Sequence, residues 1–196
     1  MKGYLKLRRK TLGILKSRLS KQLYYHNVEH TLDVVKVANQ YIMRTNIDKQ
    51  SAYLLRIAAL LHDLGFTKTD VEHEEKSAEL AEELMLEYGF SKNQIKVVQG
   101  LIRATRIPQS PKTDLERIIC DSDLDYLGRN DFYEISNRLY KELKAASMVF
   151  NKTHWNKAQI KFLEAHKYHT AFAQKNRQPK KEMRIIEIKK YGFRLS

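Results

Sequence analysis

Apolar residues recur along most of the chain at the three- and four-residue spacing that is typical of amphipathic helices. One such stripe begins after Asn27, a favourable N-cap residue, and comprises Leu32, Val35, Ala38 and Ile42. Residues 52–61 (AYLLRIAALL) are almost wholly apolar and predict a buried central helix, which Gly65 is suited to end. The same criteria predict further helices over residues 4–19, 73–88, 91–104, 113–127, 131–148 and 153–174.

Only one stretch is ambiguous, the run RIIEIKKYGF near the C-terminal end, which suits either a short strand or a frayed helix. The chain has only seven Gly and three Pro, which leaves few tight turns for an all-β fold. No strand pattern is strong enough to build a sheet. We therefore expect an all-α fold, a compact bundle of six or more helices.

Length and cysteine content bound the organisation of the protein. A chain of 196 residues with 42% hydrophobic residues can bury the core of one domain, and we expect a single domain over residues 1–196. Cys120 is the only cysteine, so no intrachain disulfide can form, which fits a reducing compartment. The N-terminal stretch lacks the apolar core of a signal peptide, and no apolar run approaches a membrane span. These features predict a cytoplasmic protein.

The net charge of +13 lies at the two ends of the chain. Residues 1–22 contribute +8 and contain no acid, and residues 175–196 contribute +6, which leaves the middle of the chain with −1. Such basic termini can contact nucleic acid or an anionic membrane surface. They can also attract a phosphorylated substrate, or simply be solvated, and nothing in their sequence separates these alternatives.

Polar residues that can bind a metal follow the apolar helices at three places. His26 and His30 lie one helical turn apart, His62-Asp63 ends the central apolar run, and three acids lie at 121, 123 and 125. A carboxylate buried at the end of a core helix needs a partner, since an unpaired buried charge costs several kcal/mol. Imidazoles and carboxylates that converge on one point bind a divalent cation such as manganese, iron, zinc, nickel or magnesium.

The ordered set YHNxxH at 25–30, His62-Asp63 and a late aspartate in CDSDLDYLG resembles the HD-domain superfamily of metal-dependent phosphohydrolases. The YHNxxH form is similar to cyclic-nucleotide phosphodiesterases. The longer run from YHNVEHTLDVV to DSDLDYLGR is similar to HD domains found alone or beside bacterial adenylate and guanylate cyclases. The resemblance covers about residues 20–175 and implies a multi-helix bundle with a metal site in its core.

The resemblance also implies roles for individual residues. The metal ligands would be His30, His62, Asp63 and Asp123, with Asp121 as the competing acid. We favour Asp123 because the following leucine matches the phosphodiesterase register. His26 would protonate the leaving oxygen and, with Asp63, carry catalysis. This division suits the chemistry, because a ligating imidazole must be neutral whereas a general acid must carry a proton. Glu29 or a backbone carbonyl can orient the ring of His26.

A second group of residues is expected around the substrate phosphate. His73 resembles a further histidine that some family members use for a second metal or for phosphate. Arg103 and Arg106 can clamp phosphate oxygens or, equally, form salt bridges with the acidic helix 74–87, and Lys68 is a further candidate. The chain departs from the phosphodiesterases at Phe66, where they have a histidine, and from HD-GYP relatives that place a lysine nearby. Both departures argue against two metals, unless His73 completes the second site.

The resulting expectation is a metal-dependent phosphodiesterase that acts on a nucleotide, foremost a cyclic nucleotide, by attack of a metal-activated water on phosphorus. Other HD activities stay open, such as hydrolysis of guanosine tetraphosphate or of nucleoside monophosphates. A rival from another class is a non-catalytic sensory or interaction module that keeps the metal. A nucleic-acid binder that depends on the basic termini is a further rival.

Overall fold

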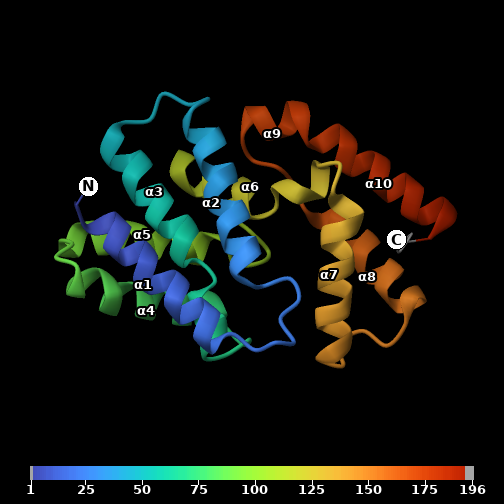
Figure 1. Ribbon diagram of the computed structural model, residues 1–196. Helices are drawn as coiled ribbons and strands as arrows, with labels where there is room; N and C mark the ends of the chain where they lie inside the picture. Colours follow the sequence, from blue (N-terminus) through green and yellow to red (C-terminus); the bar gives the residue numbers. More distant parts are fainter. Residues whose placement is uncertain (1, 193–196) are drawn as a thin grey trace. The chain divides into compact units, whose positions relative to one another are not determined.

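The computed structural model describes residues 2–192, which form ten α-helices and two short 3-10 helices and contain no β-strand (Figure 1). The all-α prediction is therefore confirmed. None of these helices combines the length and the hydropathy that crossing a bilayer requires. The outermost parts of the predicted basic termini, residue 1 and residues 193–196, lie outside the described residues, as does the last residue of RIIEIKKYGF.

Backbone contacts divide the chain into two compact units. The first unit extends to Ser20 and runs again from His26 to Asp123; the second comprises Lys21–Tyr25 and the chain from Leu124 onward. The first unit contains α1 (Lys2–Arg18), α2 (Val28–Ile42), α3 (Lys49–Leu61), η1 (Leu64–Thr67), α4 (His73–Glu87), α5 (Lys92–Ala104) and α6 (Asp114–Asp123). The second contains η2 (Asp125–Gly128), α7 (Phe132–Ala145), α8 (Lys152–Ala165), α9 (Ala171–Asn176) and α10 (Gln178–Tyr191).

Helix α3 is the centre of the first unit and packs against α1, α2, α4, α5 and α6. Asp48 caps its start by accepting hydrogen bonds from the backbone N–H groups of Gln50 and Ser51. All residues from 57 to 61 are buried, as the apolar run predicts. Since His62 follows directly as the C-cap of α3, the most buried helix delivers the His-Asp pair into the interior.

Gly65 has a different role from the helix stop that its sequence position predicts. Helix α3 ends at Leu61, and Gly65 lies inside η1, where its backbone N–H donates to Ser77 Oγ at 2.7 Å. A Cβ atom at this position would lie 2.0 Å from the backbone oxygen of His73. Glycine is therefore required because η1 and the first turn of α4 touch backbone to backbone, which brings His73 beside the HD segment.

Two predicted helices end earlier than their periodicity indicates. The helix predicted over 113–127 stops at Asp123 and continues as η2, and that predicted over 153–174 is interrupted after Ala165. Tertiary contacts in the second unit explain the second break. Tyr168 Oη donates to the backbone oxygen of Leu124 at 3.1 Å, and Lys181 Nζ donates to the backbone oxygen of His166. The ambiguous C-terminal stretch is helical as part of α10.

Lys181 of α10 is only 1% exposed, and burial lowers the pKa of its ammonium to about 8. The ordinary pKa of a lysine is 10.5. At pH values between about 8 and 10.5, the unfolded chain therefore binds one more proton than the folded chain, and the free energy of unfolding rises with pH. We expect Lys181→Met to be more stable than wild type at pH 7. This advantage should shrink by about 3 kcal/mol between pH 8 and 10.5.

Urea denaturation at several pH values measures this difference, and Lys180→Met on the exposed neighbour serves as the control. A stability difference between Lys181→Met and wild type that stays constant across this pH window would contradict a buried ammonium.

Candidate metal centre

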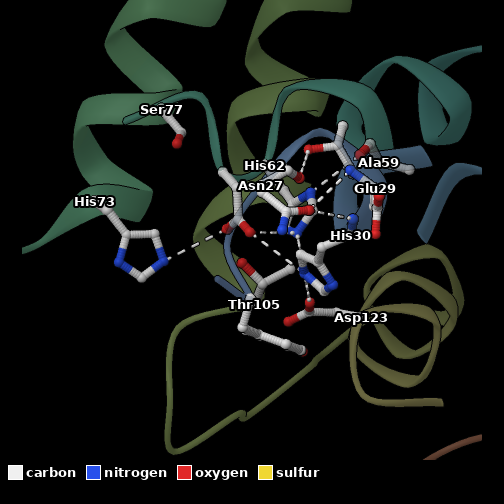
Figure 2. Close-up of polar contacts among 12 residues, drawn as sticks. Asn27, Glu29, His30, Ala59, His62, His73, Ser77, Thr105 and Asp123 are labelled. Carbon is white, nitrogen blue, oxygen red and sulfur yellow. Dashed lines mark hydrogen bonds and ion pairs between the residues drawn. The ribbon is translucent and has the colours of Figure 1, made fainter. Parts of the chain in front are cut away.

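His30 is held in place by the start of α2. The side-chain oxygen of Asn27 accepts hydrogen bonds from the backbone N–H groups of Glu29 at 2.9 Å and His30 at 3.2 Å. This is an N-cap, and it fixes the first turn of the helix. The Asn in YHNVEH therefore sets the direction in which the His30 side chain leaves the backbone (Figure 2).

The ring of His62 has a defined tautomer. Its Nδ1 lies 3.0 Å from the backbone oxygen of Ala59, one turn earlier in α3. Because a carbonyl oxygen only accepts, Nδ1 carries a hydrogen and donates it. In the neutral ring, the lone pair is then on Nε2, which faces His30.

Figure 2 shows His30 of α2, His62 at the end of α3 and Asp123 at the end of α6 directed toward one another. Asp63 joins them as a fourth side chain. His62 Nε2 lies 3.3 Å from His30 Nε2, 3.2 Å from Asp63 Oδ2 and 3.4 Å from Asp123 Oδ1. His30 Nε2 lies 3.3 Å from Asp63 Oδ2 and 3.2 Å from Asp123 Oδ1. All four side chains are largely buried.

The electrostatics of the cluster favour positive charge at its centre. Burial disfavours the charged imidazole of His30, but the adjacent Asp123 and Asp63 outweigh it and raise its pKa to about 9. Burial likewise lowers the pKa of His62, but the same two carboxylates outweigh it and hold this pKa well above 6.5. Burial alone would raise the pKa of Asp63 and Asp123, yet the two histidines hold both below 3.8. A metal ion that binds here therefore displaces protons.

The donor set fits a divalent cation. Two ligands that lie about 2.0–2.2 Å from one ion, at angles of about 90–110°, are themselves about 3.0–3.5 Å apart, as these atoms are. Asp63 Oδ2 is buried and accepts no hydrogen bond from the described residues, although two imidazole nitrogens face it. Among the described residues, the group whose ligand atoms all lie close enough to hold one ion comprises His30, His62 and Asp123. Neither Asp121 nor Asp63 belongs to this group, although Asp63 Oδ2 lies 3.3 and 3.2 Å from the two imidazole nitrogens. Asp121 is fully buried on α6.

His26 and His73 lie beside the cluster, with Phe66 against both. The Phe66 ring stacks on His26 with 4.2 Å between centroids and on His73 with 4.0 Å. The His26 ring is 6.0 Å from that of His30. His73 Nε2 lies 3.6 Å from Asp63 Oδ1, the oxygen that the His30–His62 pair does not use, and burial lowers the pKa of His73. The structure therefore brings both predicted histidines to the site.

Two of the predicted phosphate-binding cations, Arg103 and Arg106, form salt bridges with acidic side chains. Arg103 donates to both carboxylate oxygens of Glu75 at 2.7 and 2.6 Å, and Arg106 pairs with Glu72 at 3.1 Å. The Arg103 pair is the salt bridge to the acidic helix 74–87 that the sequence offered as the alternative role, whereas Glu72 is the residue before α4. All four side chains are substantially exposed. Lys68 and Glu29 are also exposed.

Two neighbours of the site were missed as functional candidates. Glu74 Oε1 lies 3.5 Å from His73 Nε2, and the residue is almost completely buried. Phe66 stands out in the sequence only as a departure from the phosphodiesterase pattern. No local signal in the sequence marks Glu74, since its burial beside His73 is visible only in the structure. Stacking by Phe66 follows from tertiary contacts that no spacing rule predicts.

Comparison with protein families agrees with this geometry. The family described as HD domain matches residues 27–125, about half of the chain, and this segment includes His30, His62, Asp63 and Asp123. Neither the curated proteins nor the solved structures contain a match to the chain. The extent of the family match, together with the all-helical fold and the His/Asp cluster, shows that the chain belongs to the HD-domain superfamily of metal-dependent phosphohydrolases.

Proposed function

We propose that the protein is a metal-dependent phosphodiesterase whose substrate is a nucleotide, with a cyclic nucleotide as the leading candidate. The observation that supports this most is the buried donor set of His30, His62, Asp63 and Asp123 with a further imidazole, His26, which precedes the N-cap of α2 and whose ring centroid lies 6.0 Å from that of His30. When bound, a divalent cation activates water and neutralises charge on phosphoryl oxygens. The choice of a nucleotide substrate rests on the resemblance of YHNxxH to the phosphodiesterases.

The residues around the cluster have separable tasks. Once an ion displaces their protons, His30 and His62 would present neutral nitrogen ligands, and Asp63 and Asp123 would supply the negative charge to hold the cation. The His62 Nδ1–H to Ala59 hydrogen bond keeps the ligating nitrogen oriented. Asp63 faces the histidine pair with one oxygen and His73 with the other, so it would connect the ligand cluster to His73, a residue suited to contact the substrate phosphate.

His26 is the proposed proton donor to the leaving oxygen. It lies outside the set of ligand atoms, yet its ring is close enough to His30 for a phosphate at the ion to reach it. Stacking on Phe66, with 4.2 Å between centroids and 24° between planes, limits rotation of the His26 ring. Cleavage of the P–O bond would leave an alkoxide that this imidazolium neutralises by transferring its proton.

His26→Ala is expected to lower kcat by about 10²–10⁴-fold while leaving metal content unchanged, because removal of a general acid affects turnover and not ligation. A panel of cyclic, linear and pyrophosphate-containing nucleotides, with manganese added, provides the assay, and metal content is measured in parallel.

His154→Ala, on the exposed start of α8, is the control and should keep full activity. A wild-type protein that is inactive on every nucleotide of the panel would contradict the proposed function and favour a sensory module. A variant that loses metal and activity together would contradict the role of His26 as an acid.

A further inference from the structure

Helix α1 presents a stripe of basic side chains away from the core of the first unit. Leu7, Thr11 and Leu15 are buried on one side of the helix, which fixes its orientation. The exposed side carries four cations, Lys6, Arg9, Lys10 and Lys16. The first and last of them are ten positions apart, about 15 Å along the helix, which matches a few consecutive phosphates of a nucleic-acid strand.

These four cations have no acidic partner among the described residues, and residues 1–22 contain no Asp or Glu at all. Some exposed cations of other helices are paired with acids of the same helix. Lys76 pairs with Glu79 and Arg138 with Glu134 on their own helices. The positive potential of α1 is therefore not neutralised within the unit and is available to an anionic partner.

A hollow of about 430 Å³ adjoins the N-terminal end of this helix. Its volume is within the range of small-molecule pockets. Tyr53, Tyr88 and Phe90 contribute aromatic rings, and those of Tyr53 and Phe90 stack with 6.0 Å between centroids and 22° between planes. Gln50, Gln94 and Lys49 supply polar groups. Aromatic rings beside amide groups suit a nucleobase, which combines an apolar face with a hydrogen-bonding edge.

The hollow and the stripe are adjacent along one helix. Gly3 of α1 lines the hollow, and Lys6 and Lys10 follow it at three and seven residues, so they leave the helix on nearly the same side. A strand whose phosphates lie along Lys6, Lys10 and their neighbours can therefore place a base in the hollow. This combination of a cationic track with an aromatic pocket is typical of proteins that bind single-stranded nucleic acid.

We propose that α1 and this hollow bind single-stranded nucleic acid without sequence preference. The inference goes beyond the proposed hydrolysis and does not depend on it. A membrane surface is the less suitable partner because the apolar side of α1 is buried in the unit. Leu5 is the one large apolar residue of the helix that is strongly exposed, at 73%.

Fluorescence anisotropy with a labelled oligothymidylate tests the proposal, with the length of the oligonucleotide checked on a gel. We expect wild-type binding to weaken steeply with salt. The variant K6Q/R9Q/K10Q/K16Q should bind at least about tenfold more weakly and with a shallower salt dependence, by ~0.7 in the log–log slope for each phosphate that the variant no longer neutralises. Tyr88→Ala should weaken binding about fivefold with an unchanged salt slope.

The matched control is K141Q/K157Q/K161Q/K167Q, which removes the same charge from exposed lysines of the second unit and should bind within about twofold of wild type. Equal weakening by the two quadruple variants, no binding by wild type, or binding to phosphatidylserine vesicles in place of the oligonucleotide would each overturn the proposal. Circular dichroism confirms that the variants are folded. Loss of nucleotide hydrolysis with retained oligonucleotide binding would contradict the proposed function and not this inference.

Discussion

Asp63→Asn is expected to lower the affinity for a divalent cation at least about 100-fold and to abolish hydrolysis. The substitution keeps the volume of the side chain but removes the negative charge that faces His30, His62 and His73. An amide oxygen is a weaker ligand than a carboxylate, and even residues that only support metal ligands contribute about 10–100-fold to affinity. Titration calorimetry with manganese measures the loss directly.

Thermal melting gives a second readout for the same variant. A cation present at about 100 times its Kd stabilises the folded protein by about 2.7 kcal/mol, so a chelator should lower the Tm of wild type by about 5 °C or more. The melting temperature of Asp63→Asn should not respond to the chelator. Asp114→Asn, on the same helix as Asp123 but with a side chain that is 82% exposed, should behave as wild type. A chelator response in Asp63→Asn equal to that of wild type would contradict its role as a ligand.

Gly65→Ala is expected to destabilise the first unit by about 3 kcal/mol or more and to weaken metal binding. The new methyl group would lie 2.0 Å from the backbone oxygen of His73 and 2.9 Å from its carbonyl carbon and from the backbone nitrogen of Ser77. All three are backbone atoms of α4 and cannot rotate away as a side chain can, so η1 and α4 must separate. This movement would displace His73 from Asp63.

Gly100→Ala provides a control of the same chemistry in the same unit. Gly100 lies in α5, and a Cβ atom there would contact nothing within 4 Å. Since alanine favours a helix over glycine, this variant should gain about 0.5–1 kcal/mol. If the close contact at Gly65 is correct, urea denaturation will show a lower free energy of unfolding than wild type for Gly65→Ala and a higher one for Gly100→Ala. A Gly65→Ala protein with wild-type stability and metal affinity would show that η1 and α4 are not packed as described.

The central part of the fold could be predicted from local signals. The stripe after Asn27, the apolar run before His62 and the helix formers of 73–88 each depend on neighbours within a few residues, and α2, α3 and α4 follow them closely. The early end of α8 depends instead on Tyr168 and Lys181, whose partners are distant in the sequence. Periodicity carries no information about such contacts, so the predicted helix over 153–174 was too long.

In the candidate site, too, some residues could be predicted from local sequence, whereas others depend on contacts between distant segments. His62-Asp63 stands out because charged groups end an apolar run, and His30 stands out by its spacing from His26. The choice between Asp121 and Asp123 could not be made from spacing alone, since both lie on a helix with a buried face. Glu74 and Phe66 join the site only because Gly65 allows η1 and α4 to touch, a contact visible in the backbone geometry and absent from any motif.

Anomalous diffraction from crystals grown with manganese tests the central claim most directly. A single strong anomalous peak is expected within about 2.0–2.3 Å of the Nε2 atoms of His30 and His62, with carboxylate oxygens of Asp63 and Asp123 completing the protein ligands. Crystals of a manganese-saturated protein that show no peak there, or show it at acids elsewhere on the chain, would contradict a shared ion at this cluster and the phosphohydrolase mechanism built on it.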